Sequence, residues 1–317
     1  MRSHTDAMAH NPAGYSPTAA SLEASSRIFE TRLHERRTVW RVWGEGHPVV
    51  LLHGGFGSWT HFLRLIPWLA RDRMILCPDL PGYGDSDMPI SDDLAHSIPA
   101  AISDGLDMLV PQLAPGFAEI DVIGFSFGCS IAGLLCSRLV DEATSPKPRG
   151  LVLYGPSALG IRAAGIERTQ RLGSGLSRAK REEIHAANLG LVMLSPGTEP
   201  DAATVRLQDI NVRRTRVRGK AISQSGVLRD ALSSRPVRAL AATWGGADAY
   251  LAGLHERYRE ALSRDYPGSS ILIQEGRGHW VQHEAPQETA IFTNQFLDSI
   301  PPRENEIAPA SPERVEP

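Results

Sequence analysis

A serine flanked by glycines is the residue of this chain best placed for chemistry. Ser126 lies at the centre of a Gly-x-Ser-x-Gly segment, between an apolar run, 120–125, and a stretch of small and apolar residues, 129–140. A turn this tight between a strand and a helix strains the serine backbone and excludes side chains two residues away, hence Gly124 and Gly128. The segment therefore predicts a nucleophile elbow, with Ser126 Oγ raised above the sheet edge at the N-terminus of a helix.

A serine hydroxyl is a weak nucleophile at neutral pH, so it needs a histidine base that a carboxylate orients. Asp248 follows an apolar run, 237–243, and a glycine turn, and His279 follows a second run, 270–274, and a short loop. Both side chains would lie at the carboxyl ends of strands, the edge at which open α/β sheets bind ligands. The order Ser126, Asp248, His279 is the order that accompanies such an elbow, and we predict these three residues as a catalytic triad.

The other histidines and acids fit these roles less well. His53 comes too early in the chain for the base and is expected to be a structural residue of a loop that lines the site. His283 is expected at the surface or at the lip of a pocket, and His61 lies in a helical pattern without a strand end. Asp79 and Asp85 belong to a Gly/Pro-rich turn that organises its own backbone.

Two backbone N–H groups are expected to bind the developing oxyanion. The first is that of Phe127, at the helix start, and the second should come from the loop after the apolar run 49–53. Glycine there lets the backbone approach a bound carbonyl, so Gly55 N–H is our first candidate and Phe56 N–H the next. Apolar walls of a substrate pocket are expected from three aromatic residues, any of which could instead belong to the core: Phe56, Trp59 and Trp280.

Short apolar runs alternate with helical patterns over most of the chain. The runs expected to form strands are residues 49–53, 74–78, 120–125, 151–154, 237–243 and 271–274, and an alternating run, 37–43, suits an antiparallel edge strand. Helical stretches lie between them, such as residues 98–113, where Ile and Leu recur on one face. This alternation predicts an α/β fold, with a mostly parallel central sheet flanked by helices.

A long segment without a strand pattern interrupts the alternation. Residues 159–235 are polar and helical in pattern, and a structureless loop of that length is uncommon in a compact domain. We expect a helical cap over the active site, inserted into a core formed by residues 27–158 and 236–300. Such a cap would exclude water and shape the pocket. The ends, residues 1–26 and 301–317, show little periodicity and are predicted to be disordered tails.

Basic side chains cluster in one part of this cap: Arg206, Arg213, Arg214, Arg216, Arg218 and Lys220. Charge runs of this kind usually form a solvated helix face. The alternative hypothesis is that one arginine reaches inward and holds a substrate carboxylate in a bidentate pair, which would suit an acidic substrate.

Five segments, in this order, resemble motifs of the α/β-hydrolase superfamily, and the resemblance spans roughly residues 36–299. They are His53-Gly54-Gly55, residues 79–86, residues 124–128, residues 244–248 and Gly278-His279-Trp280. The resemblance implies the α/β-hydrolase fold, with a cap at this position in the chain. Within the superfamily, the first segment and residues 278–284 look most like meta-cleavage-product C–C hydrolases and small carboxylesterases. The longer Gly-rich oxyanion loop of the C–C hydrolases is interrupted here by Phe56.

We therefore expect a cofactor-free serine hydrolase that cleaves a small apolar or aromatic carboxylic ester, or a related acyl compound, through an acyl-enzyme. C–C bond hydrolysis of a meta-cleavage-type diketone acid would use the same triad and is an alternative. A ligand receptor on the same fold, which binds without turnover, is an alternative of another class. Epoxide hydrolases and haloalkane dehalogenases are disfavoured, since they carry an aspartate where this chain has Ser126.

Composition limits the partners. The 317 residues, 42% of them hydrophobic, suffice for one large α/β domain with an insertion. A net charge of −3 does not favour nucleic acid, no apolar run is long enough to span a bilayer, and the N-terminus lacks the layout of a secretory signal. The three cysteines lie in apolar segments, where reduced buried thiols are the default. We expect a cytoplasmic protein with a small-molecule substrate and no metal, nucleic-acid or membrane partner, and leave a homo-oligomer open.

Overall fold

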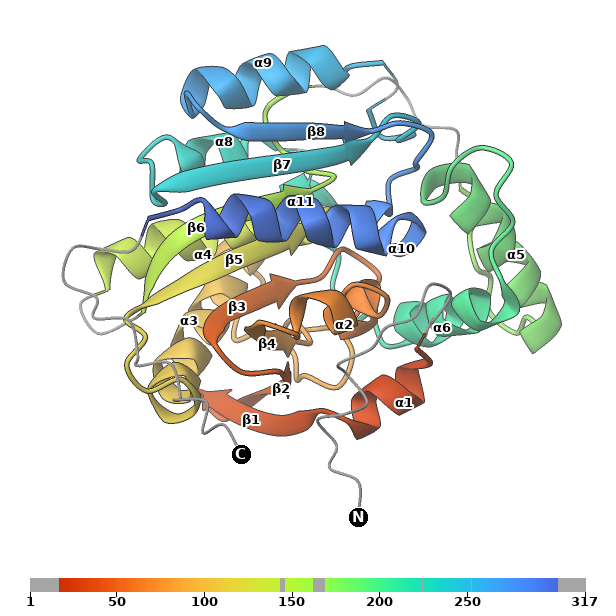
Figure 1. Cartoon of the computed structure of the whole chain (residues 1–317). Coiled ribbons are helices and arrows are strands. Elements are labelled where there is room, and N and C mark those ends of the chain that lie inside the picture. The colour runs from red at the N-terminus through yellow and green to blue at the C-terminus, as the bar shows by residue number, and fades with distance from the viewer. Residues whose placement is uncertain (1–16, 143–145, 162–168, 224, 252, 302–317) are drawn as a thin grey trace, which may run out of the picture.

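The structure is a computed structural model that describes residues 17–142, 146–161, 169–223, 225–251 and 253–301 (Figure 1). Its centre is an eight-stranded sheet with the strand order β1-β2-β4-β3-β5-β6-β7-β8. The strands are β1 (Arg27–Leu33), β2 (Arg36–Trp43), β3 (His47–Leu52), β4 (Arg73–Pro78), β5 (Glu119–Phe125), β6 (Lys147–Tyr154), β7 (Ala239–Gly245) and β8 (Ser270–Gln274). β2 pairs antiparallel with β1 and β4, and all other neighbouring pairs are parallel. The predicted α/β fold with a mostly parallel sheet is confirmed.

Helices cover both faces of the sheet (Figure 1). They are α1 (Ala19–Ala24), η2 (Trp59–Phe62), α2 (Ile66–Leu69), α3 (Leu94–Leu113), α4 (Phe127–Asp141), α5 (Arg178–Val192), α6 (Ala202–Arg213), α7 (Lys220–Ser223), α8 (Val227–Leu232), α9 (His255–Asp265), α10 (Val281–Glu284) and α11 (Pro286–Asp298). Apolar residues of α3, α4, α8 and α9 share one buried cluster, and those of α1, α2, α10 and α11 share another. Val49 and Leu51 of β3 belong to one cluster and Val50 and Leu52 to the other. This period of two explains why the strand is apolar at successive positions.

The edge beside β2 differs from the prediction. Residues 37–43 were expected to form the edge strand, but β1 pairs along the outer side of β2 and forms the edge itself. His34 and Glu35 join the two strands, with φ angles of 45° and 63°. Two-residue hairpin turns of this kind usually carry Asn or Gly, so no turn pattern is visible there. In β1, moreover, the apolar residue Ile28 is 55% exposed, so apolar and polar side chains do not alternate clearly between a buried and an exposed face.

A helix lies within the segment predicted to be an N-terminal tail. α1 begins with a capping box between Thr18 and Ser21, and Leu22 is buried in the core. Trp43 Nε1–H donates to Leu22 O at 2.9 Å. Disorder is therefore wrong for residues 19–24, because contacts with distant residues order a segment whose own composition does not. Residues 1–16 and 302–317 lie outside the described residues.

The segment between β6 and β7 carries α5, α6, α7 and α8. α5 and α6 lie beside the carboxyl ends of the strands, on the right in Figure 1. α8 packs differently, because Leu228 and Leu232 are buried in the same cluster as α4, and a Cβ on Gly133 would lie 2.6 Å from Leu228 Cδ1. Within the segment expected to form the cap, residues 159–235, α8 therefore packs on α4. In the described parts of the chain, no helix is long and apolar enough to cross a membrane.

Candidate active site

The turn at Ser126 is as tight as its glycines predict. Ser126 alone separates β5 from α4, with φ 51° and ψ −116°. A Cβ on Gly124 would lie 2.6 Å from Gly128 O, and one on Gly128 would lie 2.0 Å from Leu52 O. Only glycine fits at either position. The Ser126 N–H donates to Tyr154 O at 2.9 Å, which holds the strained backbone in place.

Asp248 and His279 form a buried pair at the same edge of the sheet. Asp248 follows β7, His279 follows β8, and the two residues are 2% and 3% exposed. His279 Nδ1–H donates to Asp248 Oδ2 at 2.7 Å, and the other carboxylate oxygen accepts the Tyr250 N–H at 2.8 Å. A neutral imidazole with its proton at Nδ1 offers the lone pair of Nε2. This Nε2 is buried and makes no hydrogen bond to any of the described residues.

Two aromatic rings and a glycine hold the imidazole in place. The ring centroids of Phe125 and Tyr250 lie 5.2 Å and 4.5 Å from that of His279. A Cβ on Gly155, whose φ is 55°, would lie 2.7 Å from His279 Cε1. Since Phe125 directly precedes Ser126, these contacts bring His279 to the elbow. Burial raises the pKa of Tyr250 to about 12, so its hydroxyl is neutral at physiological pH.

Glu284 connects the histidine loop to the cap. Its carboxylate accepts hydrogen bonds from the Gly278 N–H at 2.6 Å, the Ser195 N–H at 2.9 Å and the Ser195 hydroxyl at 2.8 Å. On the other side of the histidine, the Trp280 N–H donates to Met193 O at 2.8 Å. The residues before and after the histidine are therefore both fixed to the segment that follows α5.

The loop after β3 lies against the start of α4. A Cβ on Gly55 would lie 3.8 Å from Phe127 Cβ, so the two residues predicted as oxyanion donors are neighbours. The N–H of Gly54 is already used, because it donates to His61 Nδ1 at 3.2 Å. Within the described residues, neither the Gly55 N–H nor the Phe127 N–H has a hydrogen-bond acceptor. This arrangement leaves both groups available to a ligand.

The three aromatic residues expected around the pocket lie in different surroundings. Phe56, next to the oxyanion loop glycine, is 56% exposed and has a φ of 56°, which is unfavourable for a bulky side chain. Trp59 is 4% exposed and packs on Trp43, with ring centroids 5.5 Å apart. Trp280 is 1% exposed and donates Nε1–H to His61 O at 2.9 Å. Trp59 and Trp280 thus belong to the apolar cluster behind the site, and Phe56 lies at the surface.

Part of the basic cluster docks the cap on the core. Arg214 pairs with Asp85 at 2.8 Å, and the Arg216 guanidinium donates to Ser86 O. Arg213 pairs at 3.5 Å with an acid of its own helix. These three cations therefore face protein groups rather than an open pocket.

The remaining members of the cluster are Arg206, Arg218 and Lys220. Arg206 and Arg218 are exposed, and neither forms an ion pair within the described parts of the chain. The side chain of Lys220 lies outside the described residues. Among the arginines of this cluster, Arg206 and Arg218 are therefore the two that could bind a substrate carboxylate.

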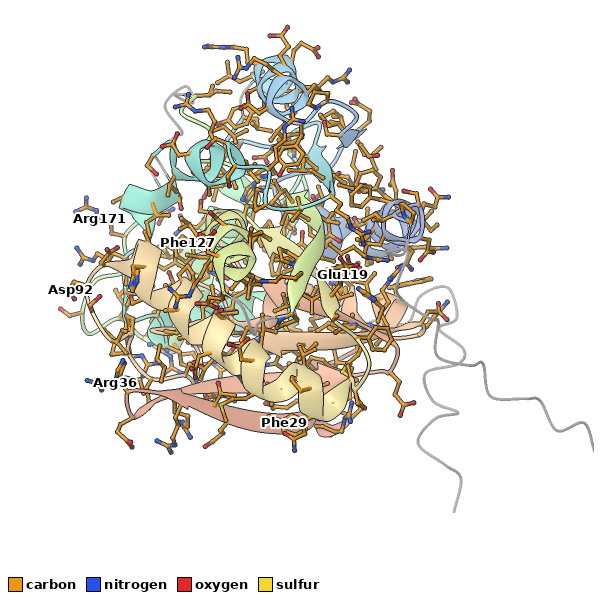
Figure 2. The ribbon with its side chains drawn as sticks, turned by 90° about the vertical axis from the view of Figure 1, so that its left-hand side faces the viewer. Phe29, Arg36, Asp92, Glu119, Phe127 and Arg171 are labelled. Atoms are coloured by element: carbon orange, nitrogen blue, oxygen red, sulfur yellow. The ribbon has the colours of Figure 1, made fainter. Side chains whose placement is uncertain are left out.

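The stretch after α6 covers the elbow. Asn211 on α6 is bonded to two hydroxyl groups at the start of η2. Farther along, Val217 packs on the core loop, where a Cβ on Gly82 would lie 2.4 Å from Val217 Cγ1. A Cβ on Gly219 would lie 2.5 Å from the ring of Phe127, the residue at the start of α4 (Figure 2). The cap backbone at Gly219 thus lies against the side chain of the first residue of α4.

Three residues of this site, and one contact, are absent from the sequence-based predictions: Gly155, Tyr250, Glu284, and the contact of His61 with Gly54. Gly155 has the clearest sequence pattern, because it ends an apolar run at the carboxyl edge of the sheet. Tyr250 lies two residues after the acid. Glu284 and His61 contact residues that are far away in the sequence, and such contacts leave no local sequence pattern. Among the described residues, no group of three or more His, Cys, Asp or Glu side chains could hold a metal ion.

The fold and the site together define a class of protein. A serine elbow follows β5, an acid follows β7 and a histidine follows β8 of a mostly parallel sheet. A model of the alpha/beta hydrolase family matches residues 49–291. The chain belongs to the alpha/beta hydrolase family.

Several known proteins are similar in sequence. An uncharacterized protein of Mycobacterium tuberculosis is 25% identical over 297 residues, which cover 87% of this chain and 82% of that protein. A 2-hydroxy-6-oxo-2,4-heptadienoate hydrolase of Pseudomonas putida is 30% identical over 142 residues, 42% of each chain. A soluble epoxide hydrolase of Corynebacterium sp. is 36% identical over 89 residues, 28% of this chain and 29% of that protein. The last match thus spans less than a third of the relative's length.

Solved structures of esterases share the fold. Carboxylesterase CesB from Bacillus subtilis has a TM-score of 0.66 at 17% identity, over 86% of this chain and 91% of that chain. Esterase RhEst1 from Rhodococcus sp. has a TM-score of 0.64 at 21% identity, over 87% of this chain and 100% of that chain. At these identities the likeness establishes the common fold.

Proposed function

We propose that this protein is a serine hydrolase that cleaves a small apolar or aromatic carboxylic ester, or a related acyl compound, through an acyl-enzyme. The observation that carries the proposal is the buried Asp248–His279 pair, whose Nε2 lacks a partner within the described residues, beside the strained elbow at Ser126. Buried polar atoms normally have hydrogen-bond partners, and an exception of this kind suits a base whose partner is a reacting group.

In the proposed mechanism Ser126 Oγ attacks the carbonyl carbon while its proton passes to His279 Nε2. His279 then gives that proton to the leaving alcohol, and later removes a proton from the water that hydrolyses the acyl-enzyme. Asp248 keeps the imidazole in the required tautomer and stabilises its cation. The N–H groups of Gly55 and Phe127 bind the oxyanion, and each such donor contributes about 3 kcal/mol in comparable sites.

The apolar contacts of the cap and the exposed ring of Phe56 support an apolar substrate. In the cap, Gly219 lies against the ring of Phe127 and Val217 packs on the core loop, which also engages Arg214 and Arg216. Phe56 is the exposed aromatic side chain beside the proposed oxyanion donors, and we assign it to the wall that contacts the substrate.

Replacement of the nucleophile tests this proposal. Ser126→Ala should abolish turnover of short aryl and alkyl esters and should abolish covalent labelling by an alkyl phosphonate. The wild-type protein should show both. Wild-type turnover rates in the Ser126→Ala variant would contradict the triad, and labelling without steady-state turnover on any ester would favour the receptor alternative.

A second candidate is hydrolysis of a C–C bond in a meta-cleavage-type diketone acid. The similarity to a 2-hydroxy-6-oxo-2,4-heptadienoate hydrolase over 142 residues supports it. Loss of the absorbance of a dienol substrate, measured beside the ester panel, separates the two activities. If a cap arginine holds the acid, Arg206→Gln or Arg218→Gln should weaken turnover of acidic substrates and leave neutral esters unchanged. Equal effects on both substrate types would exclude that role.

A further inference from the structure

Two buried histidines contact the backbone of the same glycine in the oxyanion loop. His53 Nδ1 lies 2.8 Å from Gly54 O, and the Gly54 N–H donates to His61 Nδ1 at 3.2 Å. His53 is 0% exposed and His61 is 2% exposed. Both polar groups of Gly54 are therefore held by imidazole nitrogens, one from the end of β3 and one from η2.

The partners of the two rings require opposite tautomers. The Leu80 N–H points at His53 Nε2 at 3.0 Å, and since an N–H can only donate, Nε2 is the acceptor. The proton of neutral His53 is then on Nδ1, from which it is donated to Gly54 O. His61 Nδ1 receives the Gly54 N–H, so its proton is on Nε2. Burial lowers the pKa of both imidazoles, in agreement with neutral rings.

The ring of His61 has no freedom to move away from the loop. A Cβ on Gly57 would lie 2.1 Å from His61 Cε1, so the loop backbone at Gly57 is in close contact with the ring. On other sides the ring meets Phe125 and Trp280, at centroid distances of 5.3 Å and 5.1 Å. The acceptor that faces Gly54 is thus held by packing from three directions.

The geometry of a peptide bond links this contact to the proposed oxyanion hole. Gly54 C=O and Gly55 N–H belong to one planar trans peptide, so they point in opposite directions. A hydrogen bond that fixes the Gly54 oxygen therefore fixes the direction of the Gly55 N–H. The bond from Gly54 N–H to His61 fixes the preceding peptide, and glycine at 54 has no side chain of its own to restrict rotation between the two.

We propose that His53 and His61 are a pair of positioning residues that aim the Gly55 N–H at the oxyanion. This inference rests on the proposed function, because it needs Gly55 to be an oxyanion donor. Neither imidazole touches the substrate in this role. Their effect is that the donor is preorganised, so that it need not reorient when charge develops on the carbonyl oxygen.

Paired substitutions of equal size test the role of each ring. Asn and Leu have similar shapes, but Asn can present its oxygen where His61 has Nδ1, or its NH2 where His53 has Nδ1. We expect His61→Leu to lower kcat roughly ten- to a hundred-fold with a change in KM below about three-fold, and His61→Asn to recover most of kcat. The same order, Asn above Leu, is expected at position 53. His185→Leu and His185→Asn, which replace a buried histidine in α5, are the matched controls and should not differ in kcat.

Two outcomes would overturn the proposal. One is equal kcat in the Leu and Asn variants of His61, measured on protein whose Tm shows that it is folded. The other is a proton on Nδ1 of His61 or on Nε2 of His53, as detected by nitrogen NMR of the ligand-free wild-type protein. The NMR measurement does not depend on turnover, so it judges the histidine pair even if the serine hydrolase proposal fails. Failure of that proposal is seen instead as the absence of phosphonate labelling and ester turnover in the wild-type protein.

Discussion

Two buried carboxylates lie at opposite ends of the parallel strands, and they differ in the kind of partner that each one binds. Asp248, after β7, orients a histidine whose Nε2 has no partner in the described part of the chain. Asp121, near the start of β5, accepts two hydrogen bonds from Arg149 at 2.9 Å and 2.6 Å and one from the Gly150 N–H at 3.1 Å. Asp121 is the third residue of β5, whereas Asp248 lies three residues after the last residue of β7.

Asp121 belongs to an ion pair that stabilises the fold, whereas Asp248 orients a histidine that is available for chemistry. At the amino-terminal end of the strands the buried charge of Asp121 is matched by Arg149, with Arg73 a further cation at 4.0 Å. At the carboxyl end, Asp248 accepts the hydrogen bond from Nδ1 of the imidazole, and Nε2 has no partner among the described residues. An unpartnered buried nitrogen costs stability, and such a cost is common where a substrate will provide the partner. Ligands of open α/β sheets also bind at this end.

Substitution of Asp248 should give the largest loss of activity. Asp248→Asn keeps the shape of the side chain but favours the wrong imidazole tautomer, and in a triad we expect kcat to fall by about ten-thousand-fold. Steady-state kinetics on the best ester of the panel measure this effect. The Tm of the variant should stay near the wild-type value, so that the loss of kcat does not reflect unfolding. A decrease in kcat of less than about ten-fold would mean that Asp248 is not the orienting acid.

Substitution of Asp121 should have the reverse effect. Asp121→Asn removes the buried charge that the Arg149 guanidinium contacts at 2.6 Å, and breaking a buried pair costs about 3–5 kcal/mol of unfolding free energy. Urea unfolding measures this loss, and kcat per folded molecule should stay at the wild-type value. Asp298→Asn is the control, because that carboxylate is 70% exposed and its loss should cost less than about 1 kcal/mol. A large loss of kcat in the folded Asp121→Asn variant would contradict the assignment of a purely structural role to the amino-terminal end of the strands.

The sequence predicts the elements that rely on local patterns. The apolar runs that became β3 to β8, the glycine-flanked serine and the strand-end positions of Asp248 and His279 all follow from periodicity and turn chemistry. β1 and α1 do not, because each is ordered by a neighbour, β1 by pairing with β2 and α1 by the contacts of Leu22.

The site divides in the same way. Residue types at strand ends suggested the triad, whose catalytic role remains a prediction. The contacts of Glu284 with Ser195 join segments 89 positions apart, and those of His61 depend on how η2 folds back under the loop after β3. The basic cap residues were ambiguous for the same reason, since only the fold brings Asp85 to Arg214.

A smaller loss of activity is expected where the histidine loop meets the cap. Glu284→Gln replaces one carboxylate oxygen by an NH2 group, which cannot accept the bond from the Gly278 N–H or from Ser195. The loop that carries His279 should then shift, and small displacements of a catalytic group lower kcat by roughly ten-fold or more. KM should change less than kcat. Glu288→Gln, at an exposed position on α11, removes the same charge without these bonds and should behave as wild type. Equal kinetics for the two variants would show that the link does not position the base.

The smallest effects are expected at positions of positive φ, and they again distinguish the site from the rest of the molecule. Phe56 and Glu35 have φ angles of 56° and 63°, which cost most residues about 1 kcal/mol and cost Asn less. Phe56→Asn and Glu35→Asn should therefore both raise the unfolding free energy by about 0.5–1 kcal/mol in urea titrations. Only Phe56→Asn should raise KM for aromatic esters, by roughly five-fold, because it also removes an exposed apolar surface of about one side chain next to Gly55. If both variants gain stability and both keep the wild-type KM, Phe56 does not contact the substrate, and its strained backbone has no function in binding.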